Sequence, residues 1–242
     1  MHRPVRLGML TPSSNTVLEP VTSAMLAGLA EVSVHFSRFR VTEIALSADS
    51  LAQFDDGMIL AAAELLSHAK VDAIAWNGTS ASWLGFDTDR HLCNRITGAT
   101  GIPSGTSMLA LNEVLELTGV RRLGLVTPYI APVQERIVVN YAALGYTCVA
   151  DPGLGIEDNF AFAQVSDETL AAMIRSVAAH RPDAIAVLCT NLRAAPLIAA
   201  LEAELGVPVY DTIATAVWKS LRLTGIAPNR VTGWGRLFQL GV

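Results

Sequence analysis

The chain has 242 residues, which is long enough to bury a sizeable core and is compatible with one or two domains. Hydrophobic residues make up 51% of the sequence and charged residues 16%, a composition that excludes disordered and fibrous proteins and is typical of helices packed on a covered sheet. The net charge is -5 and the 17 Lys and Arg residues form no cluster, which argues against nucleic acid and anionic membranes as partners.

No apolar run is long enough to span a membrane. Arg3 and Arg6 interrupt the N-terminus, which is also too short and too broken for a signal peptide, and Glu64 divides the apolar run 58–66. We therefore expect a soluble cytoplasmic protein. The cysteine count is 3, an odd number without close pairing, which argues against a disulfide framework.

The first predicted strand belongs to a segment that occurs twice. Residues 6–12, with the sequence RLGMLTP, recur as residues 122–128, with the sequence RLGLVTP. Further along, residues 71–80 (VDAIAWNGTS) recur as residues 182–191 (PDAIAVLCTN). Each copy is an apolar run that leads into a small polar loop, the pattern of a buried strand followed by a turn. An internal duplication of the chain is therefore indicated.

A third pair of segments and the stretches between the strands complete the repeat. Residues 100–103 (TGIP) pair with 205–208 (LGVP), and each is followed by an amphipathic segment that ends in Leu-Thr-Gly, at 117–119 and 223–225. Helical spacing predicts helices over 51–69 after the cap candidates Asp49 and Ser50, over 133–144, and over 170–179 after Ser166, Asp167 and Glu168. Strands that alternate with helices imply right-handed crossovers and parallel sheets. We expect two pseudo-symmetric α/β/α halves, each with a mostly parallel four-stranded sheet.

Four loops follow predicted strands, at the sheet edge where parallel sheets bind their ligands. These loops are residues 12–16, 78–82, 128–130 and 189–191. Because the halves are similar, a pseudo-twofold axis would bring the loops to a common cleft, which is the expected active site. Their hydroxyl, amide and backbone N–H groups suit a carboxylate or an oxyanion, although each loop taken alone is also explained as a helix cap.

Cofactor and metal chemistry lack their usual signatures. The sequence contains neither GxGxxG nor GxxxxGK[ST], so no loop for nucleotide phosphates is predicted. The 5 histidines are scattered without ligand spacing, and the strand-end loops carry no His, Asp or Glu. We therefore expect no bound cofactor and no metal ion.

Cys189 is the most reactive candidate in these loops. It directly follows the predicted strand 184–188 and precedes a predicted helix start, so we expect a partly exposed thiol in the cleft that exchanges a proton or attacks a substrate. A buried, inert cysteine is the alternative. The matching position in the first copy is Gly78, which predicts a thiol on one face of the cleft only. Cys93 and Cys148 are interpreted as packing residues.

Together these motifs resemble the aspartate/glutamate racemase superfamily, in particular its branch of maleate isomerases and arylmalonate decarboxylases. The resemblance covers essentially the whole chain. It rests on residues 10–16 with Glu19, 78–82, 127–129, Asn159 with 162–166, 188–191 and 233–237. The last of these segments is similar to the closing segment of the family, which implies that the chain returns to the first domain. The implied domains are residues 1–104 with 210–242, and residues 105–209.

The resemblance also bears on the reaction. Racemases and isomerases of the superfamily carry a cysteine in each of the two symmetry-related loops, and the first is the nucleophile of the maleate isomerases. Gly78 stands at that place here. Arylmalonate decarboxylases have Gly-Thr-Ser in the first loop and a lone cysteine in the second, as residues 78–80 and Cys189 do. Residues 12–16 have the isomerase-like form, but a missing nucleophile changes the reaction whereas a binding loop can serve several diacids.

The function that follows is cofactor-independent decarboxylation of a substituted malonate-type acid. Loss of carbon dioxide leaves an enediolate, and hydrogen-bond donors must face the charge that develops on the remaining carboxylate. Thr79, Ser80 and Tyr129 are the candidates for this oxyanion hole, and Cys189 is the candidate acid that protonates the enediolate. The candidate substrate-binding residues are Pro12, Ser13, Asn15, Gly78, Trp83, Asn159 and Thr190. Trp83 and the 10–12 region would form an apolar wall that keeps water from the departing carboxylate.

Two alternatives stay open. A maleate-type cis-trans isomerase or an amino- or hydroxy-acid racemase would need Thr79 or Tyr129 in place of the missing second thiol, and neither is as good a nucleophile as cysteine. A noncatalytic binder of small carboxylates would have kept the cleft and lost half of the catalytic pair. In each case the partner is a small carboxylic acid, and the oligomeric state is left open.

Overall fold

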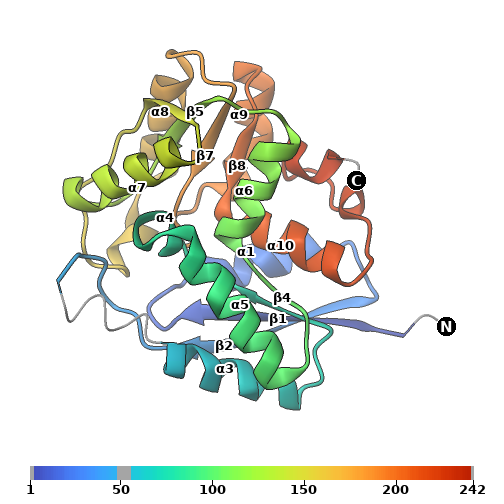
Figure 1. Ribbon diagram of the computed structural model, residues 1–242. Helices are drawn as coiled ribbons and strands as arrows, with labels where there is room; N and C mark the ends of the chain where they lie inside the picture. The colour runs from blue at the N-terminus through green and yellow to red at the C-terminus, as the bar shows by residue number, and fades with distance from the viewer. Residues whose placement is uncertain (1–2, 48–55, 241–242) are drawn as a thin grey trace.

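Two sheets organise the chain in the computed structural model, which describes residues 3–47 and 56–240 (Figure 1). The first copy of the repeat contains β1 (Val5–Pro12), α1 (Leu18–Leu26), β2 (Val32–Phe39), α3 (Asp56–His68), β3 (Ala73–Trp76), α4 (Ala81–Leu84), α5 (Phe86–Thr100), β4 (Ser104–Thr106) and α6 (Ser107–Leu117). The second contains β5 (Arg122–Val126), α7 (Ala131–Ala143), β6 (Thr147–Ala150), η1 (Ala161–Gln164), α8 (Asp167–Ala178), β7 (Ala184–Val187), η2 (Ala195–Leu197), α9 (Ile198–Leu205), β8 (Val209–Asp211) and α10 (Thr212–Leu223), followed by η3 (Pro228–Arg230) and η4 (Arg236–Gln239).

The two sheets have the same strand order. It is β2-β1-β3-β4 in the first sheet and β6-β5-β7-β8 in the second, and the neighbouring strands are parallel. Leu7 lies opposite Ala73 in the first sheet and Leu123 lies opposite Ala184 in the second, which are the positions that the sequence repeat equates. The expected α/β fold with two four-stranded parallel sheets is therefore confirmed, and the repeat in sequence is also a repeat in strand register.

The central strands β3 and β7 are short and buried along their whole length, because helices pack against the sheets. The aspartate directly before each of these strands, Asp72 or Asp183, binds the backbone of the neighbouring strand. Asp72 accepts a hydrogen bond from the backbone N–H of Arg6, and Asp183 accepts one from that of Arg122, both at 2.8 Å. Both strands therefore end at the same edge of their sheets, where the loops after Trp76 and Val187 begin.

The predicted helices are found with small shifts at their ends. α7 and α8 match the predictions over 133–144 and 170–179, and Ser166 caps α8 by accepting a hydrogen bond from the N–H of Thr169 at 3.2 Å. The helix expected over 51–69 is observed as α3 up to His68. Its expected first turn, with the cap candidates at 49–50, lies outside the described residues.

The helices α6 and α10 pack against each other where the two sheets meet, and α10 contacts strands of both sheets (Figure 1). Each begins directly after the last strand of its copy. Thr106 caps α6 by accepting from the N–H of Leu109 at 3.0 Å, and Asp211 caps α10 by accepting from the N–H groups of Ile213 and Ala214 at 2.8 and 3.2 Å. Thr106 lies opposite the last residue of β3 and Asp211 opposite the last residue of β7, so the two caps are equivalent.

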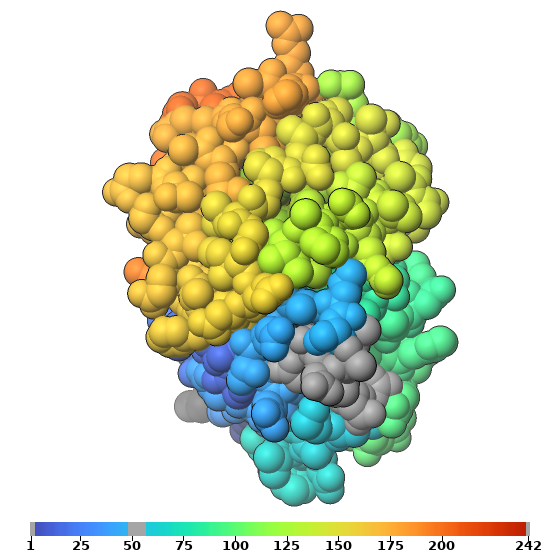
Figure 2. All heavy atoms as spheres, turned by 90° about the vertical axis from the view of Figure 1, so that its left-hand side faces the viewer, coloured from blue at the N-terminus to red at the C-terminus, as the bar shows by residue number. Residues whose placement is uncertain are grey.

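A short contact joins the two copies near the strand-end loops. The N–H of Ile44 donates to the carbonyl of Glu157 at 2.9 Å, the N–H of Asn159 donates to the carbonyl of Thr42 at 3.0 Å, and Glu43 forms an antiparallel bridge with Asp158. Figure 2 shows the light-blue segment around residue 40 lying against the golden segment around residue 160. In residues 3–47 and 56–240, every helix is too short or too polar to cross a membrane.

Candidate active site

A cavity lies where the strand-end loops of the two copies meet. It is lined by Pro12, Val41, Ile44, Trp76, Gly78, Thr79, Ser80, Trp83, Tyr129, Asn159, Cys189 and Thr190. All of the predicted site residues except Ser13 and Asn15 are among them. The space inside is about 20 Å³, room for about one water molecule. A larger ligand therefore has to displace part of the lining. Two lining residues, Ile44 and Asn159, belong to the bridge between 42–44 and 157–159.

Cys189 is buried, with 3% of its surface exposed, so the expected partial exposure is wrong. The expected helix start directly after it is also wrong, because the next helical turn is η2 at Ala195 and α9 begins only at Ile198. Burial is the main effect on the thiol and raises its pKa to about 12, against hydrogen bonds from Asn191 and Tyr129 that lower it. The sulfur therefore keeps its proton at neutral pH.

The backbone at Cys189 is strained. Its φ angle is 153°, a value that residues with a side chain rarely adopt. Two hydrogen bonds stabilise the turn: the N–H of Cys189 donates to Thr212 Oγ1 at 3.3 Å, and the N–H of Asn191 donates to the Cys189 sulfur at 3.4 Å. Strain of this kind is common where a side chain is held for function.

Tyr129 joins the two copies of the repeat inside the cavity. Its hydroxyl lies 2.6 Å from Thr79 Oγ1 and is hydrogen-bonded to the Cys189 sulfur. Its ring packs edge-on against Trp83, with centroids 5.1 Å apart. Burial, followed by the charge that Cys189 would carry, raises the pKa of Tyr129 well above its usual value. The phenol therefore stays neutral and is available as a hydrogen-bond donor.

Asn15 links the first loop to the second copy instead of lining the cavity. Its Oδ1 accepts from the N–H groups of Val17 and Leu18 at 3.0 and 2.9 Å, which caps α1. Its Nδ2 donates to Thr190 Oγ1 at 3.1 Å, and Thr190 in turn donates to the carbonyl of Asn77 at 2.9 Å. Asn15 thus positions Thr190, which does line the cavity.

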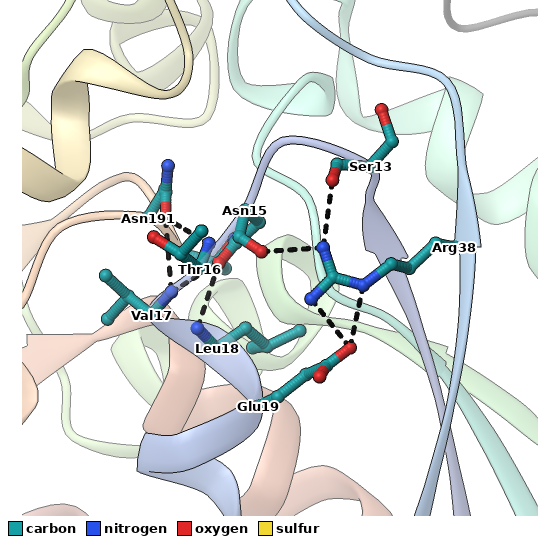
Figure 3. Close-up of polar contacts among 9 residues, drawn as sticks. Ser13, Asn15, Thr16, Val17, Leu18, Glu19, Arg38 and Asn191 are labelled. Atoms are coloured by element: carbon teal, nitrogen blue, oxygen red, sulfur yellow. Dashed lines mark hydrogen bonds and ion pairs between the residues drawn. The ribbon is translucent and has the colours of Figure 1, made fainter.

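Asn159 and Asn191 tie the same loop to the cavity from the other side. Asn191 Oδ1 accepts from the N–H of Thr16 at 3.0 Å, as Figure 3 shows, and its Nδ2 donates to the carbonyl of Asn159 at 2.5 Å. Asn159 Nδ2 donates to Ser14 Oγ at 2.7 Å. Ser13 lies beside this network, and its hydroxyl donates to the carbonyl of Val41 at 3.4 Å.

Arg38 supports the first loop from the β2 side (Figure 3). Its Nη1 donates to the carbonyl oxygens of Ser13 and Asn15, both at 2.9 Å, while its Nη2 lies 2.9 Å from Glu19 Oε1. The pair explains why a glutamate follows the loop at this distance. Arg38 thereby holds the backbone of the loop.

Gly78 is constrained by Trp76, which sequence reasoning missed. A Cβ atom added at Gly78 would lie 1.9 Å from Trp76 Cζ2, so no larger residue fits while the indole keeps its place. The carbonyl of Gly78 accepts from Ser107 Oγ at 2.6 Å, which fixes the loop further. A signal for Trp76 was present in the sequence, since it is a large side chain two residues before Gly78 at the end of the predicted strand. Val41 and Ile44 line the cavity from a stretch without a repeat or a motif, and nothing in the sequence marks them.

The described residues contain no group of three or more His, Cys, Asp and Glu side chains placed to hold a metal ion. Of the cysteines other than Cys189, Cys93 and Cys148 are half-buried and do not line the cavity. Burial raises the pKa of each of these two thiols to about 11. Both therefore remain interpreted as packing residues.

Known proteins with the same architecture are found over nearly the whole chain. A family model described as arylmalonate decarboxylase matches residues 7–238. The maleate isomerase of Pseudomonas putida is 31% identical over 240 residues, which cover 93% of this chain and 94% of that protein. The arylmalonate decarboxylase of Bordetella bronchiseptica is 34% identical over 164 residues, which cover 66% of this chain and 68% of that protein.

A solved structure shows the same fold with a reacted site. It is a mutant of the maleate cis-trans isomerase of Nocardia farcinica with a covalently bound succinylcysteine intermediate, 26% identical, with a TM-score of 0.87 over 98% of this chain and 99% of that one. The duplicated fold and these relatives define an enzyme of the aspartate/glutamate racemase-like superfamily. Within it, the chain belongs to the arylmalonate decarboxylase family, whose branch also contains the maleate isomerases.

Proposed function

We propose that this protein is a cofactor-independent decarboxylase of a substituted malonate-type dicarboxylic acid. Cys189 protonates the enediolate that remains after carbon dioxide has left, and Thr79, Ser80 and Tyr129 hold the enediolate oxygens. The observation that carries the proposal is a buried Cys189 that shares one cavity with Gly78.

The bonds change in two steps. The bond between the central carbon and one carboxylate breaks, carbon dioxide leaves, and the electron pair becomes the enediolate of the remaining carboxyl group. The S–H bond of Cys189 then breaks, its proton forms the new C–H bond, and water returns a proton to the thiolate. Thr79 and Tyr129, 2.6 Å apart, act as neutral donors to the developing charge.

Cys189 is better suited to act as an acid than as a nucleophile. Addition of sulfur to a carbon–carbon double bond needs the thiolate. Burial raises the pKa of Cys189 to about 12, which leaves only a trace of thiolate at neutral pH. The apolar side chains of Trp76 and Trp83 around the cavity also keep water from a departing carboxylate, which favours its release as carbon dioxide.

The place where the resemblance puts the isomerase nucleophile has no room for a side chain. A Cβ at Gly78 would overlap the Trp76 indole, so the cavity as it stands cannot carry a second thiol. Sequence identity does not separate the two reactions, because the relatives include both maleate isomerases and an arylmalonate decarboxylase. The lack of room at Gly78 favours decarboxylation. Maleate-type isomerisation is the alternative, supported by the isomerase relatives and by the form of residues 12–16.

The test is a parallel assay of both reactions. The purified protein is incubated in deuterated water with a panel of aryl- and alkylmalonates and, separately, with maleate. We expect carbon dioxide release and one deuterium on the α-carbon of the monoacid, lost in Cys189→Ala and kept in Cys148→Ala. Conversion of maleate to fumarate without decarboxylation of any malonate would overturn the proposal in favour of the isomerase. Stabilisation by diacids without turnover would indicate the noncatalytic binder.

A further inference from the structure

The residue that caps the helix after the fourth strand differs between the two copies. Thr106 caps α6 and Asp211 caps α10, at positions that the strand register makes equivalent. A neutral oxygen therefore suffices for this cap in the first copy. The carboxyl group occurs in the copy that carries the cavity thiol, Cys189. Aspartate accepts two backbone hydrogen bonds here where threonine accepts one, but it also places a carboxyl group in the interior.

The carboxyl group of Asp211 is buried and only half satisfied. The residue is 1% exposed, and its Oδ1 accepts the two hydrogen bonds of the cap. Its Oδ2 has no hydrogen-bond partner among the residues that the structure describes. A buried polar atom without a partner costs stability, which a threonine at this position would avoid.

Asp211 lies next to the strand end that carries Cys189. It is opposite Val187 of β7, two residues before the cysteine. The next residue, Thr212, is hydrogen-bonded to both Val187 and Cys189. Its Oγ1 donates to the carbonyl of Val187 at 3.2 Å and accepts from the N–H of Cys189 at 3.3 Å. A negative charge on Asp211 therefore opposes a second negative charge on the neighbouring sulfur, in surroundings that screen it poorly.

We propose that Asp211 is a positioning residue that adds to burial in holding the proton on the Cys189 sulfur, so that Cys189 acts as an acid and not as a nucleophile. The inference rests on the decarboxylase function proposed above. Asp211 acts on the substrate only through Cys189. In the first copy, where Gly78 has no proton to hold, the neutral Thr106 occupies the same cap.

Other groups around the sulfur also act on the pKa of Cys189. Burial raises the pKa of Cys189 most, hydrogen bonds from the N–H of Asn191 and from the Tyr129 hydroxyl lower it, and the ionised carboxylate of Asp211 raises it further. Burial raises the pKa of Asp211 itself to about 7, so the group is ionised throughout the alkaline range in which the thiol titrates. Charged residues on the elements packed against β8 and α10 are engaged elsewhere: Glu202 with the N–H groups of Val209 and Arg236, and Glu113 with Lys219 and Arg222.

The test measures how readily the Cys189 thiol loses its proton, through the openings of the cavity lining that admit a small reagent. The rate of alkylation of Cys189 by iodoacetamide is followed against pH in the full-length protein by mass spectrometry of the peptide that contains it. In Asp211→Asn, which keeps the cap and the volume and removes only the charge, we expect the thiol to titrate about one pH unit lower. Alkylation at a fixed, mildly alkaline pH should then be about threefold faster, because the gain in thiolate exceeds the loss in nucleophilicity.

Two further variants make the outcome decisive. Asp211→Ser also leaves a neutral capping oxygen, as Thr106 provides in the first copy, and should behave as Asp211→Asn does. Asp89→Asn removes the charge of another buried carboxyl group, on α5 beside Thr106, and should leave the alkylation of Cys189 unchanged. Unchanged alkylation profiles in both folded Asp211 variants, or an equal shift in Asp89→Asn, would overturn the inference. The readout needs no turnover, so failure to decarboxylate any malonate would count against the proposed function alone.

Discussion

Gly78 and Cys189 occupy equivalent positions in the two copies of the repeat and line the same cavity, one after β3 and the other after β7. The duplicated fold has two equivalent positions at the cavity, and only one of them, position 189, carries a thiol. Trp76 fills the second place. The site has become asymmetric although the scaffold around it has stayed symmetric, down to the register of the central strands.

Cys189→Ala should abolish decarboxylation while the fold and diacid binding persist, because the proposed task of the thiol is proton transfer. Initial rates, melting temperature and a diacid thermal shift measure the three properties. Cys93→Ala and Cys148→Ala are the matched controls, since neither thiol lines the cavity. A selective loss of turnover in either control at unchanged melting temperature would mean that another thiol is the acid.

Tyr129→Phe should lower kcat by about 100-fold or more with a small change in KM, because the hydroxyl faces the charge of the transition state more than the substrate. It also removes the bond to Thr79. Tyr141→Phe is the control: Tyr141 is equally buried, and its hydroxyl has no hydrogen-bond partner among the described residues. Equal losses of activity in the two variants would contradict a specific role for Tyr129.

Two buried carboxyl groups should make the protein less stable as the pH rises. Burial raises the pKa of Asp89 and of Asp211 from 3.8 to about 7. Each therefore binds its proton more tightly in the folded state, and the free energy of unfolding falls between about pH 4 and about pH 7 on their account. The melting temperature should drop across this window, and Asp89→Asn should reduce the drop. Asp87→Asn, which changes an exposed residue on the same helix as Asp89, should leave the drop in melting temperature unchanged.

The fold was predictable because the repeat carries it in short apolar strands. Residues 71–80 and 182–191 align without a gap, and their strands occupy the same register in both sheets. The site was predictable where a residue belongs to a strand-end loop, as Thr79 and Cys189 do. The burial of Cys189 was not, since Val41 and Ile44, which line the same cavity, come from a segment distant in sequence that no motif marks. The domain boundaries stay a prediction.

Gly78→Cys alone should destabilise the protein, because its Cβ would overlap the Trp76 indole. The loss of stability should exceed the about 1–3 kcal/mol that ordinary overpacking costs. Trp76→Leu alone should also destabilise, since it leaves a hole beside Phe39. The double variant should be more stable than the sum of the two losses predicts. Denaturant unfolding of all four proteins gives this coupling energy. Strict additivity would mean that the indole does not occupy the place of the missing side chain.

The triple variant Trp76→Leu, Gly78→Cys, Cys189→Ala tests the asymmetry of the site itself. In the proposed mechanism the proton reaches the enediolate from the Cys189 side, so an α-substituted malonate with two different substituents should yield one enantiomer of the product. The triple variant moves the only cavity thiol to the other copy, and its proton would approach the opposite face of the same enediolate. We expect slower decarboxylation with the opposite enantiomer in excess, measured by chiral chromatography. Trp76→Leu alone is the control and should keep the native handedness. An excess of the native enantiomer from the folded, active triple variant would mean that positions 78 and 189 do not address opposite faces of the bound substrate.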